Sequence, residues 1–311
     1  MRSLLAMVMV LLAILVAFPA DAATRVIGNV AEAWGVAVDS QNNIYVSDSI
    51  SKIYKIAPSG NVTVLASALK SPWGLAVDAQ DNLFIALNRD PSTAIAEIPA
   101  GTSTVQPFVP RSAVPAGADG LTFDTQGNLF LTASNGGIYE VPKGTSIPVT
   151  LGTGFADPVG IAVDASGNVF VSRYIFNEID EIPASAATPV SFGSGLVYAS
   201  GLNGPAGLAF DSAGNLLVAI FGNSSIGTTV DTIPAGSPAP AAATILVTGL
   251  NQPEYLAYHL GTLYIANSAG GQLLTTAPPI PALLPSAMAL FGVLIAASGV
   301  AATQRRRPTH S

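Results

Sequence analysis

A phrase of six residues recurs six times along this chain and constrains the fold more than any other feature. Most copies place a glycine second, apolar residues or alanine in the middle and an aspartate last, as in Trp-Gly-Leu-Ala-Val-Asp at 73–78. The copies occupy residues 34–39, 73–78, 119–124, 159–164, 206–211 and 254–259. Their starts are separated by 39, 46, 40, 47 and 48 residues, a period that suits a small antiparallel sheet repeated around an axis.

Each unit contains four short apolar and β-branched stretches with turn residues between them, which predicts four strands. The first unit places them at 35–38, 44–47, 52–56 and 62–66. The sixth unit has only three, whereas residues 25–30 form an extra strand before the first unit. Pairing the two ends would close the ring and remove its exposed edges. We therefore predict an all-β fold, a six-bladed β-propeller of four-stranded antiparallel blades at 23–277, closed by the N-terminal strand.

Two recurrent signals have structural explanations. Aspartate is followed four residues later by asparagine, with glycine, asparagine or aspartate just before it, at 39–43, 78–82, 124–128, 164–168 and 211–215. Aspartate caps a turn and the residue before the asparagine takes the left-handed conformation, so we expect tight hairpins. A calcium loop is the alternative, but its full ligand spacing and terminal glutamate are missing. The glycines of the phrase are expected where blades converge and larger side chains would collide.

The two ends of the chain have the composition of targeting segments. Residues 1–22 read as a secretory signal peptide with a small-x-small site at 20–22, and an uncleaved anchor is the alternative. A proline-rich linker at 278–281 precedes a hydrophobic helix at 282–304, long enough to span a bilayer, and a basic cytoplasmic tail at 305–311. We therefore expect an exported protein, anchored in a bacterial cell envelope or extracellular after processing.

The order of linker, apolar helix and arginine cluster resembles the PEP-CTERM class of sorting signals, although the Pro-Glu-Pro signature is absent. That resemblance implies an exosortase-type processing enzyme as a partner. A plain membrane anchor is the competing interpretation.

Composition excludes several functions. The chain has no cysteine, which rules out disulfides, thiolate metal sites and a cysteine nucleophile. Setting aside Arg2, Asp21 and the three tail arginines leaves 8 basic and 18 acidic residues. Such a surface repels phosphate backbones, so nucleic acid is not an expected partner. A Ser-His-Asp triad is also not expected, because the only histidines are His259 and His310.

The repeat units resemble NHL repeats and the wider group of six-bladed propellers that includes gluconolactonase-like hydrolases and the streptogramin B lyase family. The resemblance rests on Pro-Trp-Gly-Leu-Ala-Val-Asp at 72–78 with Asn-Leu-Phe-Ile at 82–85, and on the matching segments at 158–164 and 167–171. It covers about residues 25–277 and implies the fold. Activity is not implied, because this fold hosts scaffolds, lactonases, lyases and ligand binders.

Candidate site residues follow from antiparallel pairing, which puts the start of each first strand beside the end of each second strand. One mouth of the propeller then collects the ligand-binding candidates Trp34, Trp73, Asp119 and Arg173. Oxygen ligands for Ca²⁺ or Mg²⁺ gather there too. These metal candidates are Glu32, Asp48, Asp119, Glu254 and Asn267. An exposed acidic rim and aromatic packing between blades are the alternatives.

Asp119 is the candidate for which the sequence indicates the most specific role. The segment 119–128 is similar to one in gluconolactonase-like enzymes whose first aspartate joins a metal and activates water. Those enzymes also place asparagine at other blade starts, where this chain has Trp73, Val159 and Ala206. The catalytic histidine of the lyase family has no equivalent at this mouth. The leading hypothesis is therefore a non-enzymatic propeller that binds a peptide, polysaccharide or small molecule, and the alternative is a metal-dependent lactonase or a streptogramin-lyase-like enzyme.

Overall fold

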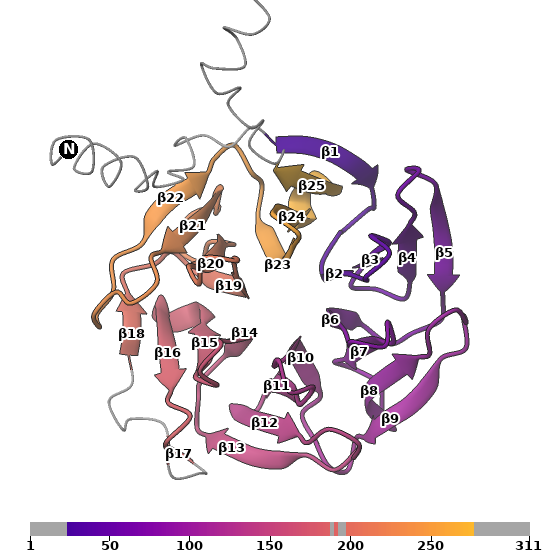
Figure 1. Ribbon diagram of the computed structural model, residues 1–311, viewed down its shortest axis with the longest axis horizontal. Helices are drawn as coiled ribbons and strands as arrows, with labels where there is room; N and C mark the ends of the chain where they lie inside the picture. Colours follow the sequence, from indigo (N-terminus) through magenta and orange to yellow (C-terminus); the bar gives the residue numbers. More distant parts are fainter. Residues whose placement is uncertain (1–23, 187–189, 192–196, 277–311) are drawn as a thin grey trace, which may run out of the picture. The chain divides into compact units, whose positions relative to one another are not determined.

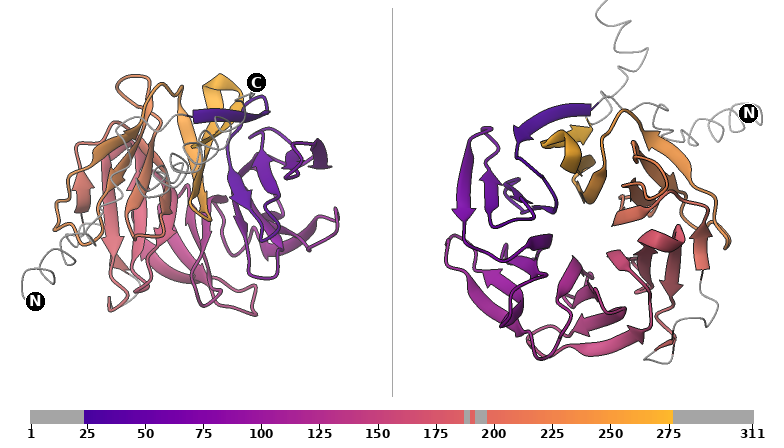
Figure 2. Two further views of the ribbon diagram at one scale, coloured as in Figure 1. Left: turned by 45° about the horizontal axis from the view of Figure 1, so that its top comes forward. Right: turned by 180° about the vertical axis from the view of Figure 1, so that it is seen from behind.

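Six antiparallel sheets lie in a ring around a central axis (Figure 1). The computed structural model describes residues 24–186, 190–191 and 197–276. Each blade begins with a strand at the axis and ends with one at the rim, and Figure 2 shows the same order from behind. The prediction of an all-β, six-bladed propeller with four-stranded blades is confirmed.

The strands of each blade are numbered in chain order. Blade 1 comprises β2 (Val36–Val38), β3 (Ile44–Ser47), β4 (Ile53–Ile56) and β5 (Val62–Ala66). Blade 2 comprises β6 (Pro72–Val77), β7 (Leu83–Leu87), β8 (Thr93–Ile98) and β9 (Gln106–Pro110). Blade 3 comprises β10 (Ala118–Phe123), β11 (Leu129–Ala133), β12 (Gly137–Val141) and β13 (Val149–Thr153).

The remaining blades follow the same plan, with two short 3₁₀ helices at the ends of second strands. Blade 4 comprises β14 (Pro158–Val163), β15 (Val169–Arg173), η2 (Tyr174–Phe176), β16 (Glu178–Ile182) and β18 (Val197–Ser200). Blade 5 comprises β19 (Pro205–Phe210), β20 (Leu216–Ile220), β21 (Thr229–Ile233) and β22 (Thr244–Val247). Blade 6 comprises β23 (Pro253–His259), β24 (Thr262–Asn267), η3 (Ser268–Gly270), β25 (Gln272–Thr276) and β1 (Thr24–Asn29).

The N-terminal strand closes the ring as predicted. Strand β1 pairs antiparallel with β25, with Arg25 opposite Thr275 and Val26 opposite Leu274. One feature was not predicted: the two-residue strand β17 (Val190–Ser191) adds to the outer edge of blade 3, parallel to β13. Its two residues belong to the connection between β16 and β18 of blade 4 and pair with the outer strand of the preceding blade.

The expected segments at 1–22, 278–281, 282–304 and 305–311 lie outside the described residues. Within the described ranges, no helix has the length and apolar character needed to cross a membrane.

The core is divided among the six junctions between neighbouring blades. Each of six buried hydrophobic clusters combines residues of two adjacent blades. The junctions are tight at the axis, where a Cβ added to Gly160 would collide with the carbonyl oxygen of Ala206 in the next blade. The same holds for the other four glycines of the phrase, which confirms the reason predicted for them.

At three of the junctions between blades, a side-chain hydroxyl group hydrogen bonds to the backbone of both blades. Ser172 Oγ accepts a hydrogen bond from the Gly160 N–H at 2.7 Å and donates one to the Ala206 carbonyl of blade 5 at 2.6 Å. Ser47 and Thr132 make the equivalent pair of bonds in blades 1 and 3. One side chain thus satisfies two backbone groups and fixes the spacing of neighbouring blades.

The hairpin interpretation of the aspartate–asparagine signal is confirmed. Asp78 Oδ1 accepts hydrogen bonds from the backbone N–H groups of Gln80 and Asn82, and its Oδ2 accepts one from the Asn82 side chain. Asn82 Oδ1 in turn accepts from the Ala100 N–H, which joins the hairpin to the turn after β8. The other four copies of the signal repeat the aspartate contacts.

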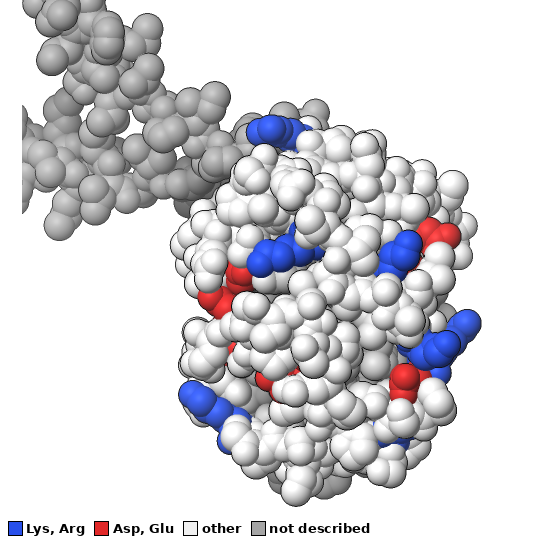
Figure 3. Space-filling model, turned by 90° about the vertical axis from the view of Figure 1, so that its right-hand side faces the viewer, with Lys and Arg blue, Asp and Glu red and all other residues white. Residues whose placement is uncertain are grey.

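Charged side chains are dispersed over the side of the rim that carries β5. Figure 3 shows the side of the ring that carries β5, where acidic and basic groups stand singly or in small groups between wide uncharged areas. The rim in this view is therefore dominated by uncharged side chains.

Candidate functional site

The mouth at which the innermost strands begin brings most of the predicted site residues together. Strand pairing places Pro72 opposite Leu87, Ala118 opposite Ala133 and Pro158 opposite Arg173. The register shifts between this first pair and the rest of each strand, which marks a bulge. Bulges redirect side chains, and here they lie where the first residues of each blade reach the mouth.

Asp119 is buried at this mouth, with 4% of its surface exposed. Its carboxylate accepts hydrogen bonds from the Asn88 side chain of blade 2 and from Ser134 Oγ, at 3.0 and 3.1 Å, in its own blade. Burial raises the pKa of Asp119 to about 7, although the bonds from Ser134 and Asn88 oppose this rise. At neutral pH the carboxyl group is therefore ionised in only part of the molecules.

Sequence reasoning did not identify Asn88 and Ser134 as functional residues. Each directly follows the end of a second strand, one position beyond Leu87 and Ala133, which pair with the first residues of β6 and β10 at the mouth. The available signal was a polar residue at the same position after two neighbouring second strands.

Glu254 is a second buried carboxyl group at the mouth. Burial raises its pKa well above the ordinary value, and the nearby charge of Asp119 raises it further. Among the described residues, none donates a hydrogen bond to its Oε2. Burial therefore favours the protonated form of Glu254, and this group is electrostatically coupled to Asp119, which lies in a different blade.

Tyr255 occupies the position at which the other five phrases have glycine. Its ring packs in the cluster between blades 6 and 1, and its hydroxyl group approaches the Val159 carbonyl oxygen of blade 4 at 3.5 Å. The side chain thus extends from blade 6 to blade 4 beneath the mouth. The sequence shows that tyrosine replaces glycine at this position. The direction in which its side chain points depends on how the six blades are arranged around the axis.

Four aromatic rings form an arc over the mouth. Trp34 and Trp73 have ring centroids 5.7 Å apart, and Trp34 lies 6.2 Å from Phe221 of blade 5. Phe221 lies 5.9 Å from Tyr174, whose hydroxyl group donates to the Gly222 carbonyl at 2.8 Å. All four side chains are half-buried, and among the described residues no acceptor pairs with Trp34 Nε1. The two predicted tryptophans therefore belong to a larger aromatic surface.

Arg173 lies within blade 4, with 1% of its surface exposed. Its Nη1 donates to Glu178 at 2.8 Å, its Nε lies 3.5 Å from Asp180, and its guanidinium carbon lies 4.1 Å from the centre of the Phe176 ring. Burial raises the pKa of Asp180 to about 6 against the opposing charge of Arg173. Its assignment as a ligand-binding residue stays a prediction.

The remaining metal candidates accept hydrogen bonds from residues of the neighbouring loops. Asp48 Oδ1 accepts hydrogen bonds from three backbone N–H groups at 50–52, at 2.7 to 3.0 Å. Asn267 Oδ1 accepts from the Asn251 N–H at 2.7 Å, and Glu32 accepts from Ser49 Oγ at 3.3 Å. Asp119 and Glu254 are the two candidates that the structure couples.

The donor set is small for a hard cation, which prefers six or more oxygen ligands. In the described part of the chain, no group of three or more acidic or histidine side chains is arranged to hold a metal ion. Binding of Ca²⁺ or Mg²⁺ stays a prediction.

We expect chelation to leave the thermal stability of the protein unchanged, because Asp48, Asp119 and Asn267 already accept hydrogen bonds from the protein, which hold them in place without an ion. The measurement is the Tm of the purified protein with EDTA and with added Ca²⁺ or Mg²⁺. A ligand that binds only the folded state raises its stability by mass action. A Tm that rises with either ion and falls with EDTA would contradict this expectation and support the metal-dependent alternative.

Comparisons with known proteins support the fold. No family model matches the chain, and no curated protein matches its sequence. A solved gluconolactonase from Xanthomonas campestris is similar in structure, with a TM-score of 0.63 and 18% identity over 81% of this chain and 88% of that one. A virginiamycin B lyase from Staphylococcus aureus has a TM-score of 0.58 and 12% identity over 81% and 98%. These neighbours are six-bladed propellers, and at such identities the likeness shows the fold alone.

Proposed function

We propose that the mouth formed by Trp34, Trp73, Asp119 and Glu254 binds a small neutral ring, such as a sugar or a lactone, and that the protein is an exported binding module of the cell envelope. The observation that supports this most is an aromatic surface beside a buried carboxyl group whose pKa is about 7. Aromatic faces pack against the apolar faces of rings, and the carboxyl groups offer hydrogen bonds to hydroxyl or carbonyl groups.

The aromatic surface and the carboxyl group are adjacent. Trp34 contacts Trp73, and Gly74, the residue after Trp73, packs directly against the backbone of Asp119 and Gly120. Blades 1, 2 and 3 therefore present these groups side by side at one mouth.

The charges at the mouth favour a ligand without negative charge. The charge of Asp157 raises the pKa of Asp119 after the larger effect of burial, and Arg111 opposes it. Arg111 donates its hydrogen bonds to backbone carbonyls, including that of Asn88 at 2.8 Å. An anionic ligand would be repelled by the acidic groups, whereas a neutral ring can exchange hydrogen bonds with them.

Intrinsic fluorescence tests this proposal directly, because Trp34 and Trp73 are the only tryptophans of the chain. We expect a member of a panel of neutral monosaccharides and lactones to change the emission saturably. Trp73→Ala should weaken binding about tenfold, since a stacked aromatic contact contributes about 1 kcal/mol or more. Tyr198→Phe, at the rim of blade 4, is the matched control and should bind as the parent protein does. Equal affinity in Trp73→Ala, or no response to any member of the panel, would exclude this site.

A second candidate function is hydrolysis of a lactone at the same mouth. It is favoured by the Asp119 pKa of about 7, which suits a general base at neutral pH. Asp119 would take a proton from water as the water oxygen bonds to the lactone carbonyl carbon. The ring C–O bond then breaks, and the leaving alkoxide receives a proton, for which protonated Glu254 is a donor at the mouth. The gluconolactonase named among the structural neighbours makes lactones the first substrates to test.

For this second candidate, we expect Asp119→Asn to lower kcat/KM for lactone hydrolysis by at least about 100-fold, because the general base is lost. The parent rate should rise with pH through about 7 as Asp119 ionises. Asn88→Ala should move this rise to higher pH, because its hydrogen bond stabilises the carboxylate form. A rate independent of pH, or an active Asp119→Asn variant, would rule out Asp119 as the base.

Lyase chemistry that depends on a histidine is less well supported. A catalytically inactive histidine variant of virginiamycin B lyase has been solved with quinupristin. Among the described residues of this chain the one histidine is His259, which ends β23 and lines a cavity at the opposite mouth with Val38 and Val163. His259 is therefore remote from Asp119 and Glu254, and the binding function is preferred.

A further inference from the structure

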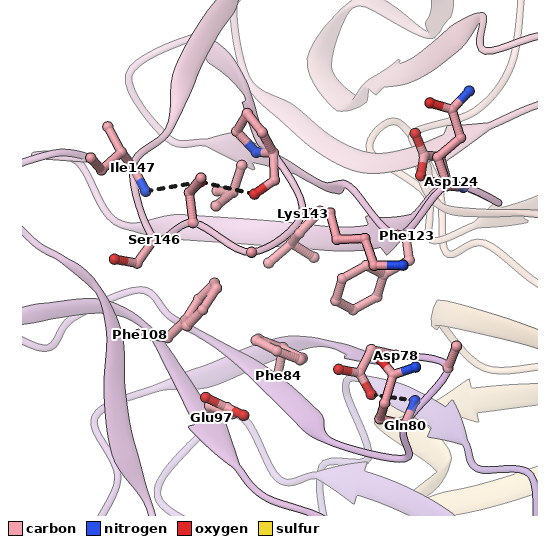
Figure 4. Close-up of a pocket in the computed structure, with 18 of the residues that line it drawn as sticks. Asp78, Gln80, Phe84, Glu97, Phe108, Phe123, Asp124, Lys143, Ser146 and Ile147 are labelled. Atoms are coloured by element: carbon pink, nitrogen blue, oxygen red, sulfur yellow. Dashed lines mark hydrogen bonds between the residues drawn. The ribbon is translucent and has the colours of Figure 1, made fainter.

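A groove of about 960 Å³ lies between blades 2 and 3, on the rim side and away from the Asp119 mouth. Phe84, Phe108 and Phe123 form its aromatic floor, and Figure 4 shows Phe84 and Phe108 on the blade 2 side and Phe123 beside Lys143 on the blade 3 side. The Phe84 ring packs edge-on against Phe108 at 4.9 Å and against Phe123 at 5.2 Å. By comparison, the gap between blades 5 and 6, lined by Leu217, Leu246 and Tyr258, measures about 10 Å³.

The same aromatic arrangement recurs between blades 4 and 5. Phe170 packs edge-on against Tyr198 at 4.8 Å and against Phe210 at 5.3 Å. The three residues hold the repeat positions of Phe84, Phe108 and Phe123 in that order. The two junctions are therefore equivalent in their aromatic floor.

At the second junction the protein itself covers the rings. The connection at 234–243, Pro-Ala-Gly-Ser-Pro-Ala-Pro-Ala-Ala-Ala, folds back from blade 5 over the outer strand of blade 4. Ala241 is buried, its N–H donates to the Tyr198 carbonyl at 2.7 Å, and it forms a parallel bridge with Ala199. A segment rich in proline and alanine is thus the occupant that fits this floor.

At the junction between blades 3 and 4, a segment is likewise added in parallel to an outer strand. Strand β17 pairs in parallel with the outer strand β13, with Gly152 opposite Val190. Gly152 and Ala199 hold the same position in their strands, because they pair with the equivalent isoleucines Ile138 and Ile179. Val109 holds that position in β9, where it pairs with Ile95.

Strand β9 has no such addition among the described residues and is the edge of its sheet. The connection of blade 3 that would cover it, at 142–148, has seven residues, whereas the one at 234–243 has ten. The groove is therefore the position of an added segment that none of the described residues supplies.

We propose that the groove binds an extended proline- and alanine-rich segment of a partner protein, which adds in parallel to β9 with an N–H donated to the Phe108 carbonyl. Adding a strand to an exposed sheet edge is a recurrent mode of peptide recognition. Pro110 has no N–H to return a second bond, so packing on Phe108 carries most of the affinity. Asp78, Glu97 and Asp124 line the groove against one lysine, which disfavours acidic residues in the peptide.

The test is isothermal titration of the purified full-length protein with the synthetic peptide Gly-Ser-Pro-Ala-Pro-Ala-Ala-Ala, which has the sequence of residues 236–243. We expect saturable binding, and at least about fivefold weaker binding of a control peptide in which both prolines are aspartate. Phe108→Ala should lower the affinity about tenfold, since one aromatic contact is lost. Tyr198→Ala, at the junction that is already covered, is the matched control and should leave the affinity unchanged.

A second variant keeps the test decisive if Phe108→Ala does not fold. Ser146 is an exposed residue of the groove wall, so Ser146→Trp fills the groove without removing a core side chain. We expect it to abolish peptide binding while the Tm stays within about 2 °C of the parent value. Absence of binding by the parent protein, or unchanged affinity in Ser146→Trp, would overturn the proposal.

Discussion

Replacing Arg25 and Thr275 by cysteine is expected to link β1 covalently to β25 and to raise the free energy of unfolding by up to about 5 kcal/mol, since the bond closes a loop of about 250 residues. The two residues are opposite one another in the antiparallel pair that completes blade 6. The parent chain has no cysteine, so no other disulfide competes. The measurements are mass spectrometry of the oxidised protein and urea unfolding with and without reductant.

The control is the pair Arg25→Cys and Thr262→Cys, because Thr262 lies in β24, which pairs with β23 and β25 rather than with β1. This pair should remain reduced under the same oxidising conditions. A failure of the first pair to form a disulfide, or equal formation in the control, would show that β1 does not close the ring in solution.

We expect Gly160→Ala to lower the free energy of unfolding by about 3 kcal/mol or more. The added Cβ would meet the Ala206 carbonyl and the Gly207 Cα of blade 5, and both are backbone atoms that can move only if blades 4 and 5 separate. Separation would also strain the bonds that Ser172 makes to both blades. Chemical unfolding of the variant and the parent protein measures the difference.

Gly60→Ala is the matched control, because Gly60 has open space around it but a φ of +85°. Only the conformational cost of a left-handed alanine applies there, which is about 1 kcal/mol. Equal effects in the two variants would mean that blade packing does not explain the glycines of the phrase.

The sequence predicted several of the residues that lie at the mouth, but it did not predict how each of their side chains is oriented. Antiparallel pairing predicted that Asp119 and Glu254 would share a mouth, and the structure couples them electrostatically. Arg173 was assigned to the same mouth from its place at the end of β15, but its guanidinium group pairs with Glu178 and Asp180. A strand position specifies which end of a blade a residue occupies, but not which way a long side chain turns.

The particular side-chain contacts between blades at the mouth could not be predicted from the sequence. Asn88 hydrogen bonds to Asp119 from 31 residues away, and Tyr255 approaches Val159 from 96 residues away. Trp34 meets Phe221 although blade 6 lies between their blades in the order of the ring. These contacts depend on how the bulges and blade junctions orient the side chains at the mouth.

The sequence by itself determined the blades, their hairpins and the closure of the ring, because each follows from local patterns: alternating strands, aspartate-capped turns and a missing strand at one end that is found at the other. Only the tertiary structure decided that burial raises the pKa of Asp119 to about 7 and raises that of Glu254 at the same mouth. It also decided that an aromatic floor is covered between blades 4 and 5 and open between blades 2 and 3. Both depend on desolvation and on the path of the connections, which arise only when distant segments pack together.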